Sequence, residues 1–277
     1  MCRVFMATKH AIMVYNRKNN LTSLFGYLVQ NCGGHGNGIA LIKDKTIIYT
    51  KKGVDYSYKQ AARALLLKNY DFALFHTRIA SVSSISDTNC HPFTYQKRFA
   101  LIMNGTINGL SGISESIGIT DTECVFNVIK GLDMDTTIKA LSTLSPVFLG
   151  VCDGLPYALK NSGALSSWTN KKLNKDDFIF SSVFPKDVKG VISLPYGYTW
   201  KDGKEVTMSK QKTYYNNSFY DDTPYYLDQN FESIGTTSKS KQTKPFEETT
   251  EDILYTEGWE DGYYTGYNDA LSENLIS

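Results

Sequence analysis

Short, almost uninterrupted apolar runs separated by turn residues are the main pattern along the first 210 or so residues of this chain. Apolar runs of four to eight residues are typical of buried strands, whereas helices need at least ten residues. The pattern therefore predicts strands at 3–8, 39–50, 72–79 and 99–105, and four more within 146–154, 155–161, 177–183 and 190–195.

Helix-forming segments lie between these strands. One helix is expected near 20–31, a second from Ser57 to about residue 70, and a third from Thr120 or Asp121 to Gly131. Strands outnumber helices, and two sheets covered by helices are the layered arrangement that buries such elements. Periodicity by itself predicts no more than a mixed α and β fold.

The chain changes character after about residue 212. Residues 213–250 are expected to be a polar, aromatic segment and linker, and 250–277 predict an acidic helix. Residues 245–277 together hold nine acidic residues and no Lys or Arg. An aromatic and aliphatic stripe recurs every four residues of it, at Tyr255, Trp259, Tyr263, Tyr267, Leu271 and Leu275. We expect one domain over residues 2–212 and a C-terminal helix that docks on that domain, on a second copy or on a partner.

Composition argues against several classes of protein. A net charge of +1 favours neither nucleic acid nor membrane partners, and the sequence has no apolar run of 18 residues and no secretory leader. The five Cys residues are odd in number and widely spaced, which argues against a disulfide framework and a metal site. We therefore expect a protein of the reducing cytoplasm.

Cys2 is the first candidate for chemistry. Removal of Met1, which the small Cys side chain permits, would leave Cys2 with a free α-amine beside its thiol. Such an amine titrates near ~7.7–8.0 and can take the thiol proton to form the nucleophilic thiolate. A Cys at the second position is ordinarily just a terminal residue, so this interpretation needs partners elsewhere in the chain.

Several further segments supply those partners: GHGNGIAL at 34–41, FHTRIAS at 75–81 with NCHPF at 89–93, IMNGTI at 102–107 and TDTE at 120–123. In this order, and together with Cys2, they resemble the class II glutamine amidotransferases, which are N-terminal-nucleophile hydrolases. The closest likeness is to the small stand-alone members, over about residues 2–210. The resemblance implies an α+β fold, a four-layer αββα sandwich.

The resemblance also implies a role for each matching residue. Cys2 would attack the side-chain amide of L-glutamine, and Asn104 with the backbone N–H of Gly105 would form the oxyanion hole. The substrate-binding residues would be Arg78 for the α-carboxylate, Asp121 for the α-ammonium, and Ser81 in the pocket wall. A thioester, glutamate and ammonia would follow without a cofactor.

Two departures from the family pattern concern the pocket. Ile79 stands where synthase members often have Trp, and Met103 stands where they commonly have His. We expect an altered pocket shape, and hydrolysis of another γ-glutamyl or acyl amide is one alternative function. Residues 213–277 are too short and too polar for a synthase domain, so the ammonia acceptor is expected to be a separate synthase or ligase, or to be absent.

Each of these residues also has an ordinary structural interpretation that involves no catalysis. Arg78 could be a solvated surface charge, Asp121 only a helix N-cap, and the Asn104–Gly105 pair only a turn. The intact set of matching residues argues against a second alternative, a non-catalytic structural or interaction protein on the same scaffold.

The resemblance assigns no chemistry to the histidines. For His76 and His91 we favour structural roles, since buried polar side chains ordinarily brace neighbouring loops. His35 lies in a Gly-rich loop, and the sequence predicts no role for it.

Overall fold

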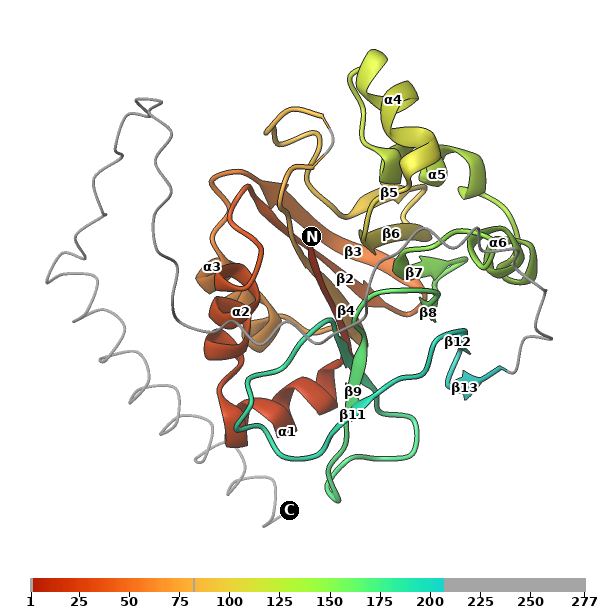
Figure 1. Ribbon diagram of the computed structural model, residues 1–277. Coiled ribbons are helices and arrows are strands. Elements are labelled where there is room, and N and C mark those ends of the chain that lie inside the picture. The colour runs from red at the N-terminus through yellow and green to blue at the C-terminus, as the bar shows by residue number, and fades with distance from the viewer. Residues whose placement is uncertain (1, 82, 207–277) are drawn as a thin grey trace, which may run out of the picture. The chain divides into compact units, whose positions relative to one another are not determined.

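The computed structural model describes residues 2–81 and 83–206 (Figure 1). The predicted boundary near residue 212, the linker and the acidic helix lie outside the described residues. Within the described part, two antiparallel sheets lie against each other, and helices cover the outer face of each sheet.

The first sheet has seven strands in the order β11–β9–β10–β1–β4–β2–β3, and all its neighbouring strands are antiparallel. Its long strands are β1 (Arg3–Thr8), β4 (Phe72–Thr77), β2 (Asn37–Lys43) and β3 (Thr46–Gly53). Its short strands are β10 (Ile179–Ser181), β9 (Ser166–Trp168) and β11 (Val191–Ser193).

The second sheet has six antiparallel strands in the order β13–β12–β8–β7–β6–β5. Its central strands are β6 (Phe99–Asn104), β7 (Val147–Cys152) and β8 (Leu155–Lys160). The remaining strands are β5 (Phe93–Tyr95), β12 (Tyr198–Lys201) and β13 (Lys204–Glu205).

The helices within the described residues form two groups of three. The first group packs on the first sheet and comprises α1 (Lys9–Asn19), α2 (Leu21–Gln30) and α3 (Tyr58–Leu67). The second group packs on the second sheet and comprises α4 (Asn108–Ser116), α5 (Asp121–Ile129) and α6 (Met134–Leu141).

Three hydrophobic cores follow from this layering. Side chains alternate along a strand, so Phe5 and Ala7 of β1 pack against the first helices, while Val4 and Met6 pack between the two sheets. The side chains of β6 alternate in the same way: one set packs in the core between the two sheets, which we call the central core, and the other set packs in the core under α4–α6. Because both faces are buried, these strands are continuous apolar runs. The predicted four-layer αββα sandwich is confirmed.

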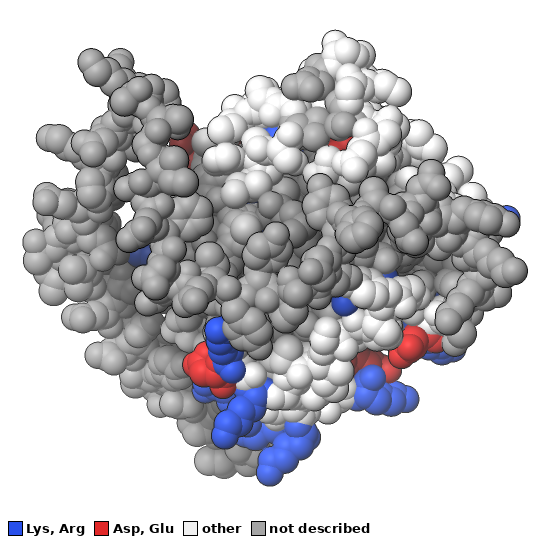
Figure 2. All heavy atoms as spheres, viewed as in Figure 1, with Lys and Arg blue, Asp and Glu red and all other residues white. Residues whose placement is uncertain are grey.

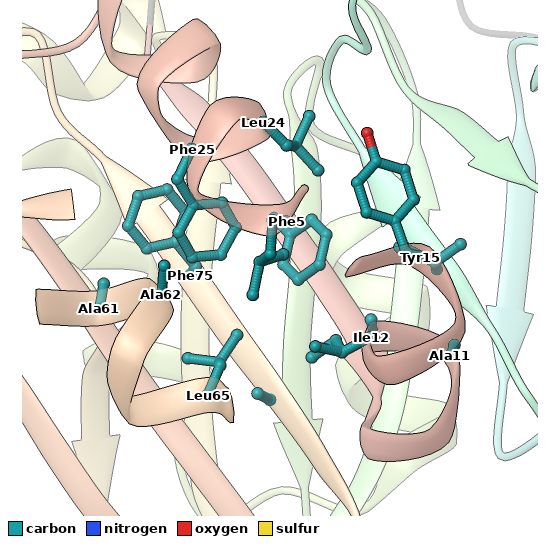
Figure 3. Close-up of a cluster of buried hydrophobic side chains, with 14 of the residues drawn as sticks. Phe5, Ala11, Ile12, Tyr15, Leu24, Phe25, Ala61, Ala62, Leu65 and Phe75 are labelled. Carbon is teal, nitrogen blue, oxygen red and sulfur yellow. The ribbon is translucent and has the colours of Figure 1, made fainter. Parts of the chain in front are cut away.

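Aromatic contacts fix the first helices to the sheet (Figure 3). Phe25 of α2 stacks on Phe75 of β4 with ring centroids 3.9 Å apart, and its ring meets Phe5 of β1 edge-on at 5.2 Å. Tyr15 of α1 meets Trp168 of β9 edge-on at 5.1 Å. Each such pair is worth roughly 0.5–1.5 kcal/mol beyond the area that it buries.

Some predicted elements need correction. The strand predicted at 39–50 is a hairpin, β2–β3, whose two turn residues Asp44 and Lys45 have φ of 48° and 60°. The prediction missed α1, α4 and α6. The strands predicted at 177–183 and 190–195 are each only three residues long.

Candidate functional site

A pocket that is partly open to solvent lies where β1 begins and where β4 and β6 end. The antiparallel register places Arg3 of β1 opposite Thr77 of β4, so Cys2 and Arg78 come to the same end of the first sheet. Five of the six predicted site residues line the pocket: Cys2, Arg78, Ser81, Gly105 and Asp121.

Cys2 is partly buried in the pocket, and its Sγ lies 3.5 Å from the carbonyl oxygen of Ile79. Burial raises the pKa of the Cys2 thiol, while the nearby Arg78 charge acts in the opposite direction. The thiol is therefore protonated at rest near neutral pH. A base must take its proton before the sulfur can attack a substrate.

Arg78 is held at the end of β4 by contacts on several sides. Its Nη1 donates to the Ser84 carbonyl at 3.0 Å, and its backbone N–H donates to the Gly36 carbonyl at 2.8 Å. His35 donates its backbone N–H to the Arg78 carbonyl at 3.0 Å and accepts the Ala80 N–H at Nδ1 at 2.9 Å. Arg78 is buried, so its interpretation as a surface charge is wrong. Through these two hydrogen bonds, His35 holds the segment that follows Arg78.

Asp121 is the first residue of α5 and is buried. Thr120 is the N-cap, since its side chain accepts the Glu123 N–H, and the interpretation of Asp121 as the cap is wrong. The Asp121 carboxylate instead accepts the N–H of Ile107 at Oδ2 and that of Thr122 at Oδ1, both at 2.8 Å. Burial raises the pKa of this carboxyl, and these hydrogen bonds oppose the shift. Asp121 thus ties the segment after β6 to α5.

Asn104 and Gly105 continue directly from β6. Asn104 is paired with Val147 of β7 and is buried beside the pocket without lining it. Its Oδ1 is buried and has no partner among the described residues. Gly105 has φ of 138°, and a Cβ there would lie 2.9 Å from the Pro146 side chain. The position therefore requires glycine, and the pair ends a strand rather than forming a hairpin turn.

Ser81 lies at the exposed side of the pocket. Its Oγ is 3.3 Å from Oγ1 of Thr106, which directly follows Gly105. This contact joins the segment after β4 to the segment after β6, so the two walls of the pocket are linked.

Sequence reasoning assigned no pocket role to three residues that line it: His91, Thr120 and Thr122. Ile79 and Met103, the two departures from the family pattern, were expected to alter the pocket shape, and both line the pocket. The two threonines flank Asp121 in the TDTE segment, so adjacency to a candidate residue was the available signal. For His91, the available signal was its place in the NCHPF segment at 89–93.

Surface charge among the described residues is mixed. Figure 2 shows, on one face, Lys and Arg side chains interspersed with Asp and Glu toward the lower rim, with a few more charged side chains scattered over the rest of the described surface. In the described ranges, no group of three His, Cys, Asp or Glu residues could hold a metal ion. None of the helices in residues 2–81 and 83–206 has the length and apolar character needed to cross a membrane.

The solved structures that are similar to this chain include one protein from B. subtilis and one from Silicibacter pomeroyi. The glutamine phosphoribosylpyrophosphate amidotransferase from B. subtilis has a TM-score of 0.49 and 21% identity, covering 72% of this chain and 47% of its own. A glutamine aminotransferase class-II domain protein from Silicibacter pomeroyi has a TM-score of 0.44 and 17% identity, covering 72% and 94%. Both scores are modest, and the architecture described above rests on this chain's own strands and helices.

Two curated proteins are similar in sequence, and no family model matches the chain. The glutamine–fructose-6-phosphate aminotransferase of Aquifex aeolicus is 26% identical over 190 residues, covering 54% of this chain and 32% of that protein. A probable glutamine amidotransferase of Saccharomyces cerevisiae is 33% identical over 82 residues, covering 25% and 22%. The chain thus spans about a third or less of these relatives. The matches confirm the relationship to glutamine amidotransferases that the motifs predicted.

Proposed function

We propose that this relative of the glutamine amidotransferases is a glutaminase, which hydrolyses L-glutamine to glutamate and ammonia through a Cys2 thioester. The observation that carries the proposal is the convergence of a partly buried thiol, a buried guanidinium and a buried carboxylate on one pocket. These are the groups needed to attack an amide and to bind the two charged ends of a free amino acid.

The reaction begins with the α-amine of Cys2, which is free once Met1 is removed. The amine takes the thiol proton, Sγ attacks the δ-carbonyl carbon, and negative charge develops on the carbonyl oxygen. The side-chain amide of Asn104 and the N–H of Gly105 stabilise that charge. The C–N bond then breaks, and the proton held by the amine leaves with the nitrogen as ammonia.

Water completes the reaction. It attacks the thioester carbon, the S–C bond breaks, and glutamate is released with the thiol restored. Thioester formation and thioester hydrolysis each pass through a tetrahedral intermediate whose oxyanion occupies the same position, so one set of donors serves both halves. No step needs a cofactor.

Substrate capture is assigned to Arg78 and Asp121, with Ser81 in the pocket wall. A guanidinium can bind both oxygens of the α-carboxylate at once, and the Asp121 carboxylate attracts the α-ammonium. Free ammonia is proposed to pass to an acceptor synthase or ligase on a separate chain. The C-terminal helix remains the predicted contact to that partner or to a second copy.

Glutamate release by mature protein tests this proposal against both alternatives. We expect turnover of glutamine well above turnover of other γ-glutamyl or acyl amides at equal concentration. Preference for another amide would support the alternative amidohydrolase. A folded protein that turns over none of these amides would support the non-catalytic alternative.

Arg78→Lys is expected to raise KM for glutamine by about 10-fold or more and to change kcat less. An ammonium is a point charge that cannot reproduce the bidentate contact with a carboxylate. Steady-state glutamate release measures both constants. Arg98→Lys is the matched control, because Arg98 forms a surface ion pair with Asp153 at 2.7 Å. An unchanged KM in Arg78→Lys would exclude Arg78 from carboxylate binding.

Asn104→Ala is expected to lower kcat by about 10²–10³-fold while KM stays within roughly threefold. The lost donor acts on the oxyanion, which exists only after Cys2 attacks, so the ground state is little affected. The exposed Asn127 on α5 offers a control, since Asn127→Ala removes the same group far from the chemistry. An effect on KM alone would show that Asn104 contacts bound glutamine instead.

A further inference from the structure

The backbone of Met103, one residue before Asn104, is bound by two histidine side chains. Its N–H donates to Nδ1 of His91 at 3.5 Å, and Nε2 of His76 lies 3.2 Å from its carbonyl oxygen. Strand β5 pairs with β6 only between Leu101 and Phe99, so it does not reach Met103. The two imidazoles therefore take the place of a strand partner at the end of β6.

The two rings also join the two sheets. His76 belongs to β4 of the first sheet, and His91 lies two residues before the start of β5 in the second. Both side chains are buried, and their ring centroids are 4.0 Å apart with planes inclined at 33°. His91 lines the pocket as well. The pair thus sits between the pocket and the central core.

Both rings are neutral. Burial lowers the pKa of His76 to about 3 and that of His91 well below its ordinary value, and the charges of Lys52 and Arg78 act in the same direction. The Met103 carbonyl accepts only from a protonated Nε2, so His76 carries its hydrogen there. His91 accepts at Nδ1 and therefore also carries its hydrogen on Nε2.

We infer that His76 and His91 are positioning residues that hold the oxyanion-hole segment Asn104–Gly105 through the backbone of Met103. The inference rests on the proposed function. A peptide unit is planar, so the Met103 carbonyl and the Asn104 N–H move together. A histidine that fixes this carbonyl also fixes the plane from which Asn104 projects. In this scheme neither histidine contacts the charged ends of bound glutamine. Their loss should therefore slow the attack by Cys2, which lowers kcat, and leave KM little changed.

Amide side chains of two lengths give a sharp test. Asn places its oxygen near the position of Nδ1, and Gln places its nitrogen near the position of Nε2. His91→Asn and His76→Gln therefore keep the contacts with Met103, whereas His91→Gln and His76→Asn carry the same group to the wrong place. His91→Leu and His76→Leu remove the contacts altogether.

We expect the leucine and wrong-length variants to lose about 10–100-fold in kcat, with KM within roughly threefold, because small misplacements of catalytic groups cost this much. His91→Asn and His76→Gln should recover most of the loss. His10→Gln is the control, since His10 lies at the surface against Asp177. Kinetics with glutamine and thermal unfolding of each variant are measured together.

The outcomes separate this inference from the proposed function. Wild-type protein without glutaminase activity overturns the proposed function, and this inference with it. Active wild type with unchanged kcat in folded leucine variants, or with KM as the constant that changes, overturns the inference alone. If the leucine variants do not fold, the comparison of right-length with wrong-length amides decides, and equal kcat in both overturns it.

Discussion

Cys2→Ala protein is expected to fold normally and to lose about 10⁴-fold or more of its glutamate release, because no other group can form the thioester. Cys2 precedes β1, and its side chain belongs to the pocket rather than to any of the three cores. Its truncation therefore removes little packing. Glutamate release and thermal unfolding, compared with wild type, measure the two parts of the expectation.

Cys124→Ala is the matched control for this loss. Cys124 is partly buried on α5 and does not line the pocket.

Intact-mass spectrometry of active wild type should show loss of Met1, and a glutamine-analogue electrophile should label Cys2 only. Retained Met1 in fully active protein, or turnover by Cys2→Ala, would exclude the α-amine mechanism.

The strands that position the site could be predicted because they are buried on both faces. Continuous apolar runs mark β1, β4 and β6, whose ends meet at the pocket. Pattern alone gave no layer order, which came from the family resemblance. Helix α4 was missed because its sequence NGLSGISES contains two glycines, which are poor helix formers. Helix α1 was missed because its pattern is weak and Asn20, with φ of 58°, separates it from α2.

The contacts inside the site could not be predicted in the same way. The sequence indicated Asp121 as a candidate but not its hydrogen bond to the Ile107 N–H, 14 residues away in the chain. The contacts of His76 and His91 with Met103 depend on where β5 stops pairing with β6. Such contacts join side chains to backbone groups, and any residue type can supply a backbone group. The register of the strands determines which backbone group meets which side chain, and that register cannot be inferred from amino-acid composition.

Asp121→Asn is expected to reduce kcat/KM for glutamine about 10-fold or more relative to glutaramate, which is glutamine without its α-ammonium. The asparagine keeps one acceptor oxygen but has no charge to attract an ammonium. Its amide hydrogens also face the N–H of Ile107 or of Thr122, which leaves a buried donor unsatisfied and costs about 1–3 kcal/mol of stability. The ratio of the two substrates cancels effects that are common to both.

Thr120→Ala separates charge from stability in this comparison. It removes the N-cap of the same helix at a cost of about 1 kcal/mol, yet it leaves the Asp121 carboxylate in place. The substrate ratio should therefore stay at the wild-type value in Thr120→Ala and fall in Asp121→Asn. Equal ratios in both variants would show that Asp121 only supports the fold.

Acidification provides an independent check on Asp121. Burial raises its pKa above the ordinary value of 3.8, so its charge is lost at a higher pH than that of an exposed carboxyl. Below that pKa the neutral carboxyl no longer attracts an ammonium, and KM for glutamine should rise as the pH falls through it. KM for glutaramate should lack this rise, as should KM for glutamine in Asp121→Asn. A rise shared by both substrates would assign the titration to another group and leave Asp121 without a role in ammonium capture.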